Sequence, residues 1–304
     1  MAVQSIKVAV LLTCFNRKDM TVSCLNKLNQ ARDKYNESSQ RQVELTVFLT
    51  DDNCTDGTAE AVLECMGNEK CNILHADGNA YWAGGMRIAW KAAIQAGDWD
   101  FYLLLNDDTD PWDNLFFQLF EAHEFALSRY GAGGIYSGNT STKSDITKIS
   151  FGGKIKAGTI IKRFHRVMPN GTPQRCDIVN ANILLVVSDV VDKIGIFPEC
   201  YKHGAADNDY GMRANKAKLP VLVTSGFCGS CDSDNYKLKD ELHKIAQMSN
   251  EERNKYFSHP VHSIKDKLAF SWRWRKEVVP YILIDYFLKR RFPLLYSKIC
   301  ANYD

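Results

Sequence analysis

The chain has 304 residues, of which 45% are hydrophobic and 24% are charged, and its formal net charge is +2. This composition indicates a globular protein with a sizeable core. The small net charge excludes a general attraction to nucleic acid. The length fits one large α/β domain with an appendage, or two domains. No stretch reaches the roughly 18 apolar residues that a transmembrane helix needs.

Ten cysteines are scattered along the chain, and Cys228 and Cys231 form the only CxxC pair. Neither a second CxxC nor a histidine pair completes a zinc set. The cysteines therefore indicate reduced thiols in a cytoplasmic protein.

Hydrophobic segments predict four strands that alternate with helices along the first third of the chain. The strands are expected at 6–13, 43–50, 71–75 and 101–105, and the helices at 16–32, 55–66 and 86–96. In the first helix the apolar spacing of Met20, Cys24 and Leu28 marks the buried face. This alternation predicts an α/β fold with a mostly parallel, Rossmann-like sheet flanked by helices.

The later part of the chain has a different composition and a different pattern of apolar residues. Residues 131–175 are rich in Gly, Ser, Thr and Lys and predict a β-rich or loop-rich excursion, with a strand-like piece at 159–163. Residues 178–187 return to an apolar strand, and Ser188 and Asp189 begin a helix. After 232 the pattern is helical.

An acidic cluster follows the strand at 101–105, where Asn106, Asp107, Asp108 and Asp110 end a run of apolar residues. Open α/β sheets bind their ligands at the carboxyl ends of their strands. Hard oxygen ligands suit Mg²⁺ or Mn²⁺, and such ions usually share their coordination shell with substrate phosphates. An acidic turn in which Pro111 starts a helix is the alternative.

The other strand ends should converge on the same edge of the sheet. Residues 13–17 contain no glycine, so the fingerprint of a classical dinucleotide fold is absent. Asp52 is placed to accept hydrogen bonds from a base or ribose, or else to cap a turn. Gly84 and Gly85 are predicted just before a helix, where backbone can approach an anion. Arg87 would assist a diphosphate there, unless it is a solvated helix charge.

A second acidic site spans residues 207–213. Asp207 is the candidate general base, and the spacing of Asp209 and Arg213 predicts an ion pair that holds the local structure. A capped helix start is the alternative interpretation. His203 would orient a substrate or simply be packed.

These segments, in this order over residues 5–230, resemble a family 2 glycosyltransferase, nearest the bacterial rhamnosyltransferase-like branch. The resemblance implies a GT-A fold and an inverting transfer from a nucleotide-diphosphate sugar. It implies that Asp108 binds the metal with Asn106, Asp107 or Asp110, and that Asp207 is the base, although Ala206 replaces the glutamate of the family's Glu-Asp motif. It also suggests His259 or His262 as a further metal ligand. The expected substrate contacts are Thr13, Asn16, Arg17, Asp52, Asn79, Trp82, Gly84, Gly85, Arg87, Asp107, His203, Asp209 and Arg213.

The resemblance divides the chain into a catalytic domain at 1–230 and a helical C-terminal extension at 231–304. The catalytic domain would have a nucleotide-sugar half at 1–112 and an acceptor half at 113–230. Residues 265–304 hold nine Lys or Arg against four Asp or Glu, interleaved with aromatic residues. This composition fits an interfacial helix on the inner face of the cell membrane. Packing on the catalytic domain, or in a homodimer, is equally open.

The expected function is metal-dependent transfer of a sugar from a UDP- or dTDP-linked donor to a glycan or lipid-linked acceptor, in surface polysaccharide synthesis. Two alternatives remain. A nucleotidyltransferase uses a similar sheet edge, but it would need a basic, glycine-rich loop after the first strand. A non-enzymatic nucleotide-sugar or glycan-binding module would not need both Asp108 and Asp207.

Overall fold

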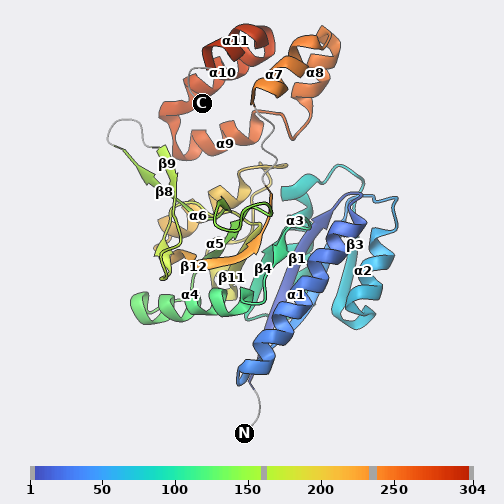
Figure 1. Cartoon of the computed structure of the whole chain (residues 1–304), viewed down its shortest axis with the longest axis vertical. Coiled ribbons are helices and arrows are strands. Elements are labelled where there is room, and N and C mark those ends of the chain that lie inside the picture. Colours follow the sequence, from blue (N-terminus) through green and yellow to red (C-terminus); the bar gives the residue numbers. More distant parts are fainter. Residues whose placement is uncertain (1–3, 159–162, 233–237, 301–304) are drawn as a thin grey trace.

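The structure, a computed structural model, describes residues 4–158, 163–232 and 238–300 (Figure 1). Its first part alternates strands and helices as predicted, and the predicted strands at 71–75 and 101–105 have the observed bounds. The elements are β1 (Gln4–Cys14), α1 (Lys18–Ser38), β2 (Arg41–Asp51), α2 (Thr58–Met66), the 3₁₀ turn η1 (Asn68–Lys70), β3 (Cys71–His75), α3 (Tyr81–Ala96) and β4 (Phe101–Leu105).

The rest of the chain completes the sheet and then becomes helical. The elements up to Ser230 are β5 (Asp110–Pro111), α4 (Leu115–Tyr130), β6 (Ile135–Ser141), β7 (Ile149–Phe151), β8 (Lys154–Ala157), β9 (Arg163–Arg166), β10 (Gln174–Arg175), β11 (Ile183–Val187), α5 (Ser188–Ile194), α6 (Ala206–Lys216) and β12 (Val221–Ser230). The C-terminal elements are α7 (Leu238–Gln247), α8 (Asn250–Ser258), α9 (Lys265–Trp274), the 3₁₀ turn η2 (Lys276–Val278), α10 (Val279–Arg291) and α11 (Pro293–Cys300). Of the strand-like piece predicted at 159–163, residues 159–162 lie outside the described residues.

The main sheet has the strand order β10-β12-β6-β11-β4-β1-β2-β3, with β5 beside β12 and β7 beside β6. Strands β4, β1, β2 and β3 are parallel neighbours, which confirms the α/β prediction for the first part of the chain. Strand β11 is antiparallel to both β4 and β6, so the second part of the sheet is mixed. This reversal brings the start of β11 beside the end of β4, because Ile183 pairs with Leu105.

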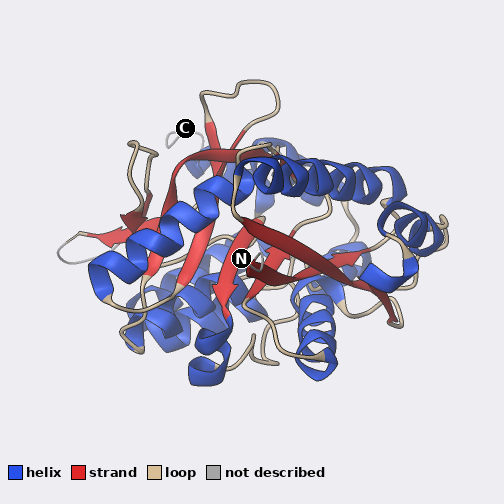
Figure 2. Ribbon diagram, turned by 90° about the horizontal axis from the view of Figure 1, so that it is seen from below, coloured by secondary structure: helices blue, strands red, loops and turns tan. Residues whose placement is uncertain are grey.

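Helices cover both faces of the sheet, so that its central strands are buried on both sides (Figure 2). In β1, Val8 and Val10 pack in the core that contains α1, α2 and α4. The intervening Ala9 and Leu11 pack in the opposite core, beneath α3 and α6. Alternate residues of a strand point to opposite faces, so an unbroken apolar run is what such a strand requires. The buried face of α1 includes Cys24 and Leu28 as predicted, but Met20 is 54% exposed.

Several predicted boundaries differ from the observed ones, and two of the differences concern the site. Helix α3 begins at Tyr81, so Gly84 and Gly85 lie inside its first turns and not before it. Strand β11 begins at Ile183, whereas residues 178–182 form a connection that precedes it. The polar residues Asn180 and Asn182 interrupt the apolar pattern there, and their side chains make the contacts described below.

Candidate active site

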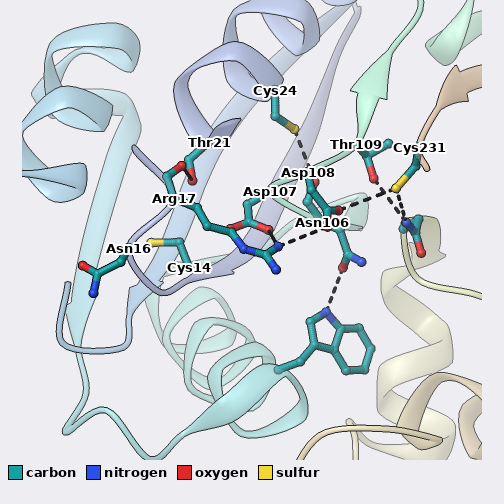
Figure 3. Close-up of polar contacts among 12 residues, drawn as sticks. Cys14, Asn16, Arg17, Thr21, Cys24, Asn106, Asp107, Asp108, Thr109 and Cys231 are labelled. Atoms are coloured by element: carbon teal, nitrogen blue, oxygen red, sulfur yellow. Dashed lines mark hydrogen bonds and ion pairs between the residues drawn. The ribbon is translucent and has the colours of Figure 1, made fainter. Parts of the chain in front are cut away.

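The acidic cluster lies at the carboxyl end of β4 and faces Arg17, which follows β1 (Figure 3). One guanidinium nitrogen of Arg17, Nη1, lies 3.1 Å from Asp107 Oδ1 and 3.1 Å from Asp108 Oδ2. Asp107 is buried, whereas Asp108 and Arg17 are partly open to solvent. The two carboxylates therefore converge on one positive group at the mouth of the site.

Burial raises the pKa of Asp107 to about 6, although the nearby Arg17 opposes that rise. Asp108 adds to it, because two carboxylates this close disfavour a second negative charge. The pair consequently needs a cation, and Arg17 is the cation that the chain itself supplies.

Asn106 is held in place from two sides. Trp82 Nε1 donates a hydrogen bond of 2.8 Å to Asn106 Oδ1 (Figure 3), and the Asn106 backbone N–H donates to the carbonyl of Asn182. Trp82 thus ties the first turn of α3 to the end of β4. It acts on the acidic cluster through Asn106.

Asp110, predicted as an alternative metal ligand, points to different partners. Its two carboxylate oxygens lie 2.9 Å from Lys27 Nζ and 3.0 Å from Lys143 Nζ. Burial raises its pKa, but the two lysines outweigh burial and the pKa is lowered. Because both oxygens are already neutralised, Asp110 is removed from the proposed ligand set.

Asp207 lies in the first turn of α6 and is 8% exposed. Its Oδ1 accepts a hydrogen bond of 2.7 Å from the Asn208 backbone N–H. Its Oδ2 accepts bonds of 3.3 Å from the Ala181 backbone N–H and 3.4 Å from Asn180 Nδ2. Burial raises the pKa of Asp207 to about 6, although these backbone donors oppose the rise. A carboxylate with a pKa near 6 is ionised at neutral pH and basic enough to accept a proton.

The connection 180–182 links the two acidic sites. Asn180 and Ala181 donate to Asp207, and the Asn182 carbonyl accepts from the backbone of Asn106. Asn182 Nδ2 also lies 3.1 Å from Cys231 Sγ, and that sulfur is 3.7 Å from Asp108 Oδ1. Asp207 and the segment after β4 therefore contact the same three residues.

The predicted ion pair between Asp209 and Arg213 is wrong. Asp209 is fully buried and accepts hydrogen bonds from Arg273 and from Trp274 Nε1, both in α9. Arg213 donates to the Ile196 carbonyl and lies over the Tyr210 ring. The spacing of four residues was suitable for a pair, but a partner 64 residues along the chain takes the carboxylate.

His203 contacts the C-terminal extension, where its backbone N–H donates to Asp266. Burial lowers its pKa; Asp266 opposes this effect, while His259, His262 and Arg17 reinforce it. His259 packs edge-on against the Tyr81 ring, and His262 stacks on Tyr256. His203 Nδ1 is buried and has no hydrogen-bond partner within the described part of the chain.

Asp52 and Asn16, two of the expected substrate contacts, hold loops in place. Asp52 accepts hydrogen bonds from the backbone N–H groups of Gly78, Ala80 and Tyr81, so it holds the loop before α3 and does not cap a local turn. Asn16 Oδ1 accepts from the Thr55 backbone N–H at 2.7 Å. These contacts fix the ends of β1, β2 and β3 relative to one another.

Gly85 and Arg87 also have structural contacts. A Cβ atom on Gly85 would lie 2.1 Å from Thr13 Oγ1, so this glycine permits α3 to approach β1. Arg87 Nη1 donates to the carbonyls of Pro198 and Tyr201. A cavity of about 220 Å³ lies beside it, and its lining includes Asn79, Gly84 and Arg87.

The donor set suits a divalent cation that shares its coordination with a phosphate. Asp107 and Asp108 present carboxylate oxygens toward one position, and the adjacent Asn106 has an amide oxygen that accepts from Trp82 Nε1. Among the described residues, no group of three or more His, Cys, Asp or Glu side chains is arranged as a complete metal site. Mg²⁺ commonly binds through one or two carboxylates plus substrate phosphates, so a complete protein cage is not needed.

Sequence reasoning missed several residues that shape the site. Two of them, Asn180 and Asn182, were signalled by their polarity at the start of an apolar strand. The others, Cys231, Asp266, Arg273 and Trp274, come from distant segments and carry no local signal.

Comparison with known proteins shows the fold. No family model matches the sequence, and no curated protein sequence matches it. S. aureus TarS 1–349 in complex with UDP-GlcNAc has a TM-score of 0.52 and 15% identity, over 93% of this chain and 81% of that chain. The mannosyltransferase PcManGT from Pyrobaculum calidifontis in complex with GDP-Man and Mn²⁺ has a TM-score of 0.49 and 14% identity, over 97% and 74%. The likeness to TarS supports the predicted GT-A type of α/β fold.

Proposed function

We propose that this chain is an inverting, metal-dependent glycosyltransferase that moves a sugar from a nucleotide-diphosphate donor to a hydroxyl acceptor. The observation that carries the proposal is that residues 180–182 contact Asp207 and also, through the Asn106 backbone and Cys231, the acidic cluster. One acidic site suits a phosphate-bound cation, and the other suits removal of a proton. TarS, whose fold this chain shares, was solved with the nucleotide sugar UDP-GlcNAc.

In the proposed reaction, Asp207 accepts the proton of the acceptor hydroxyl as that oxygen attacks the anomeric carbon. The bond to the diphosphate breaks on the opposite face, so the configuration at that carbon inverts. Asp107 and Asp108, with Asn106 beside them, would hold Mg²⁺ or Mn²⁺. A bound cation would neutralise the departing diphosphate as a Lewis acid. Arg17 lies against the same acids and is placed to meet the phosphate charge.

The motif resemblance further leads us to propose a UDP- or dTDP-linked donor, a glycan or lipid-linked acceptor, and a role in surface polysaccharide synthesis within the rhamnosyltransferase-like branch. A thermal-shift screen of nucleotide sugars with Mn²⁺ tests the donor, because a ligand that binds the native state raises the melting temperature. Asp108→Ala should remove the Mn²⁺-dependent part of that shift. Asp207→Ala should keep the shift but abolish transfer. Equal shifts in wild type and Asp108→Ala would refute the metal assignment, and normal turnover in Asp207→Ala would refute the base.

We also propose that the extension lies on the cytoplasmic face of the membrane. None of the described helices combines the length and apolarity needed to cross a bilayer. On α10, however, Tyr281, Ile284 and Phe287 each expose more than half of their surface. Lys289, Arg290 and Arg291 follow in its last turn. Exposed aromatic and aliphatic side chains beside cations suit an anionic lipid surface.

Vesicle flotation tests this contact. Wild type should float with vesicles that contain phosphatidylglycerol and stay behind with phosphatidylcholine alone. The double variant Ile284→Ser/Phe287→Ser should lose the difference. Equal flotation of the two proteins would refute the membrane contact. A wild-type dimer by light scattering that the double variant loses would assign the same face to a homodimer instead.

A further inference from the structure

Helix α9 of the C-terminal extension contacts the segment that leads into the Asp207 helix. In Figure 1 α9 lies between the other C-terminal helices and the part of the fold that contains α6. Phe270, in the middle of α9, is part of the same core as Tyr210 of α6. The extension is therefore packed into the catalytic fold at this point.

A buried carboxylate makes the first connection. Asp266, in the first turn of α9, is 8% exposed. Its oxygens accept hydrogen bonds from three consecutive backbone N–H groups, those of Lys202, His203 and Gly204, at 2.7 to 3.2 Å. Charged acceptors make the stronger hydrogen bonds in proteins, and three donors on one carboxylate fix the backbone that carries them.

A second buried carboxylate makes the return connection. Asp209, on α6, accepts from Arg273 Nη1 at 3.0 Å and from Trp274 Nε1 at 2.7 Å, in the last turn of α9. Asp209 is fully buried, so loss of these donors would leave a buried charge without compensation. Helix α9 thus holds an acid of α6, and its own acid holds the segment that leads into α6.

The segment that Asp266 holds joins the two sides of the candidate active site. The Lys202 carbonyl accepts from the Gly84 backbone N–H of α3, at 3.4 Å. Ala205, with a φ of 63°, turns the chain directly into α6. Asp207 is two residues beyond that turn. A change in the 202–204 backbone would therefore displace both His203 and the base.

We propose that Asp266 is a positioning residue for the transfer step. Asp266 with its contacts to residues 202–204, and Asp209 with its contacts to Arg273 and Trp274, form a two-carboxylate latch that fixes residues 202–207. The proposal rests on the proposed function, because it assumes that Asp207 is the base. Asp266 itself makes no contact with substrate in this scheme. It acts through the backbone that places His203 and Asp207.

Amide hydrogen exchange tests the latch without any turnover. Asp266→Asn keeps the shape of the side chain but removes its charge and one acceptor oxygen. The amides of Lys202, His203 and Gly204 should then exchange at least about tenfold faster. Glu251→Gln, at an exposed acid on α8, is the matched control and should leave them unchanged. Unchanged exchange in Asp266→Asn would overturn the proposal.

Kinetics test the positioning role. Asp266→Asn should lower kcat by about tenfold or more, because small misplacements of a catalytic group are costly. The dissociation constant of the donor and the number of donor sites per chain should stay within about twofold. An equal fall in donor-site number and kcat would mean partial unfolding and would overturn the proposal.

Trp274→Phe is the second variant, in case Asp266→Asn does not fold. It removes one hydrogen-bond donor to Asp209. If the two carboxylates act as a unit, the amides of residues 202–204 should again exchange faster. Faster hydrogen exchange that is confined to the amides of α9 would show that the two carboxylates act independently and would overturn the proposal. If wild type transfers no sugar, the proposed function fails, while the exchange results still decide whether the latch exists.

Discussion

Replacement of Asp207 by asparagine should abolish transfer and, at neutral pH, remove a destabilising charge. Burial raises the pKa of this carboxyl from its ordinary value of 3.8 to about 6. A carboxyl whose pKa is higher in the folded state favours folding when protonated. Its contribution is therefore fully present below the unfolded pKa and is lost as the pH rises through about 6.

The size of this effect follows from the shift. A difference of roughly two pKa units between folded and unfolded states corresponds to about 3 kcal/mol of stability. Most of it, about 2 to 3 kcal/mol, should be lost between about pH 4 and about pH 7.5. An asparagine side chain has one acceptor oxygen in place of two, so it cannot satisfy the N–H groups of both Ala181 and Asn208. That loss costs about 1–3 kcal/mol at every pH.

Urea unfolding of wild type and Asp207→Asn at several pH values measures how the free energy of unfolding of each protein depends on pH. The free energy of unfolding of the variant, relative to wild type, should rise by about 2 to 3 kcal/mol from about pH 4 to about pH 7.5. The hydrogen-bond loss is the same at each pH and cancels from that rise. Wild-type kcat should fall about tenfold for each pH unit below about 6, as the base becomes protonated.

A relative stability that does not change with pH would refute the raised pKa. A raised pKa without an acid limb in kcat would refute the role of Asp207 as the base. The two outcomes separate the electrostatics of the site from its chemistry.

Two further predictions concern the donor side. Arg17→Gln should raise the Mn²⁺ affinity of the donor-free protein several-fold, because Asp107 and Asp108 lose their cation; Arg17 is partly exposed, so the gain is limited. Electron paramagnetic resonance of free Mn²⁺ measures this, and an unchanged or weaker affinity would contradict it. Gly85→Ala should lower the free energy of unfolding by about 1–3 kcal/mol, because its Cβ would meet Thr13. Gly84→Ala is the matched control: its Cβ meets no atom closer than 3.6 Å, so it should be neutral or stabilising, and equal losses would contradict the packing argument.

The parallel part of the fold was predictable because its signals are local. The strand at 101–105 is a short apolar run between polar segments, and both it and the strand at 71–75 were predicted with their observed bounds. The position of Asp107 and Asp108 at the end of β4 followed from the same pattern. A strand buried on both faces is marked by an unbroken apolar run, which the sequence shows directly.

The partners of the site residues were less predictable, because they come from distant parts of the chain. Asp209 was assigned to Arg213 by spacing, but Arg273 takes it. Asp52 was expected to meet a nucleoside, but it accepts three backbone N–H groups from the loop before α3. Short-range spacing states which pairs are possible. Tertiary packing decides which of them form.

The contacts of Asp209 with α9, and of Asp266 with the segment before α6, limit how chains of this kind can be recombined during evolution or in the laboratory. The last strand of the sheet ends at Ser230, and a crossover there looks natural. A chimaera joined at that point to an unrelated tail would leave Asp209 as a buried carboxylate without its hydrogen-bond donors. The backbone N–H groups of residues 202–204 would lose their acceptor. Such a defect can cost a large part of the total stability of an ordinary domain. Viable hybrids should therefore carry the segment through Trp274 along with the sheet.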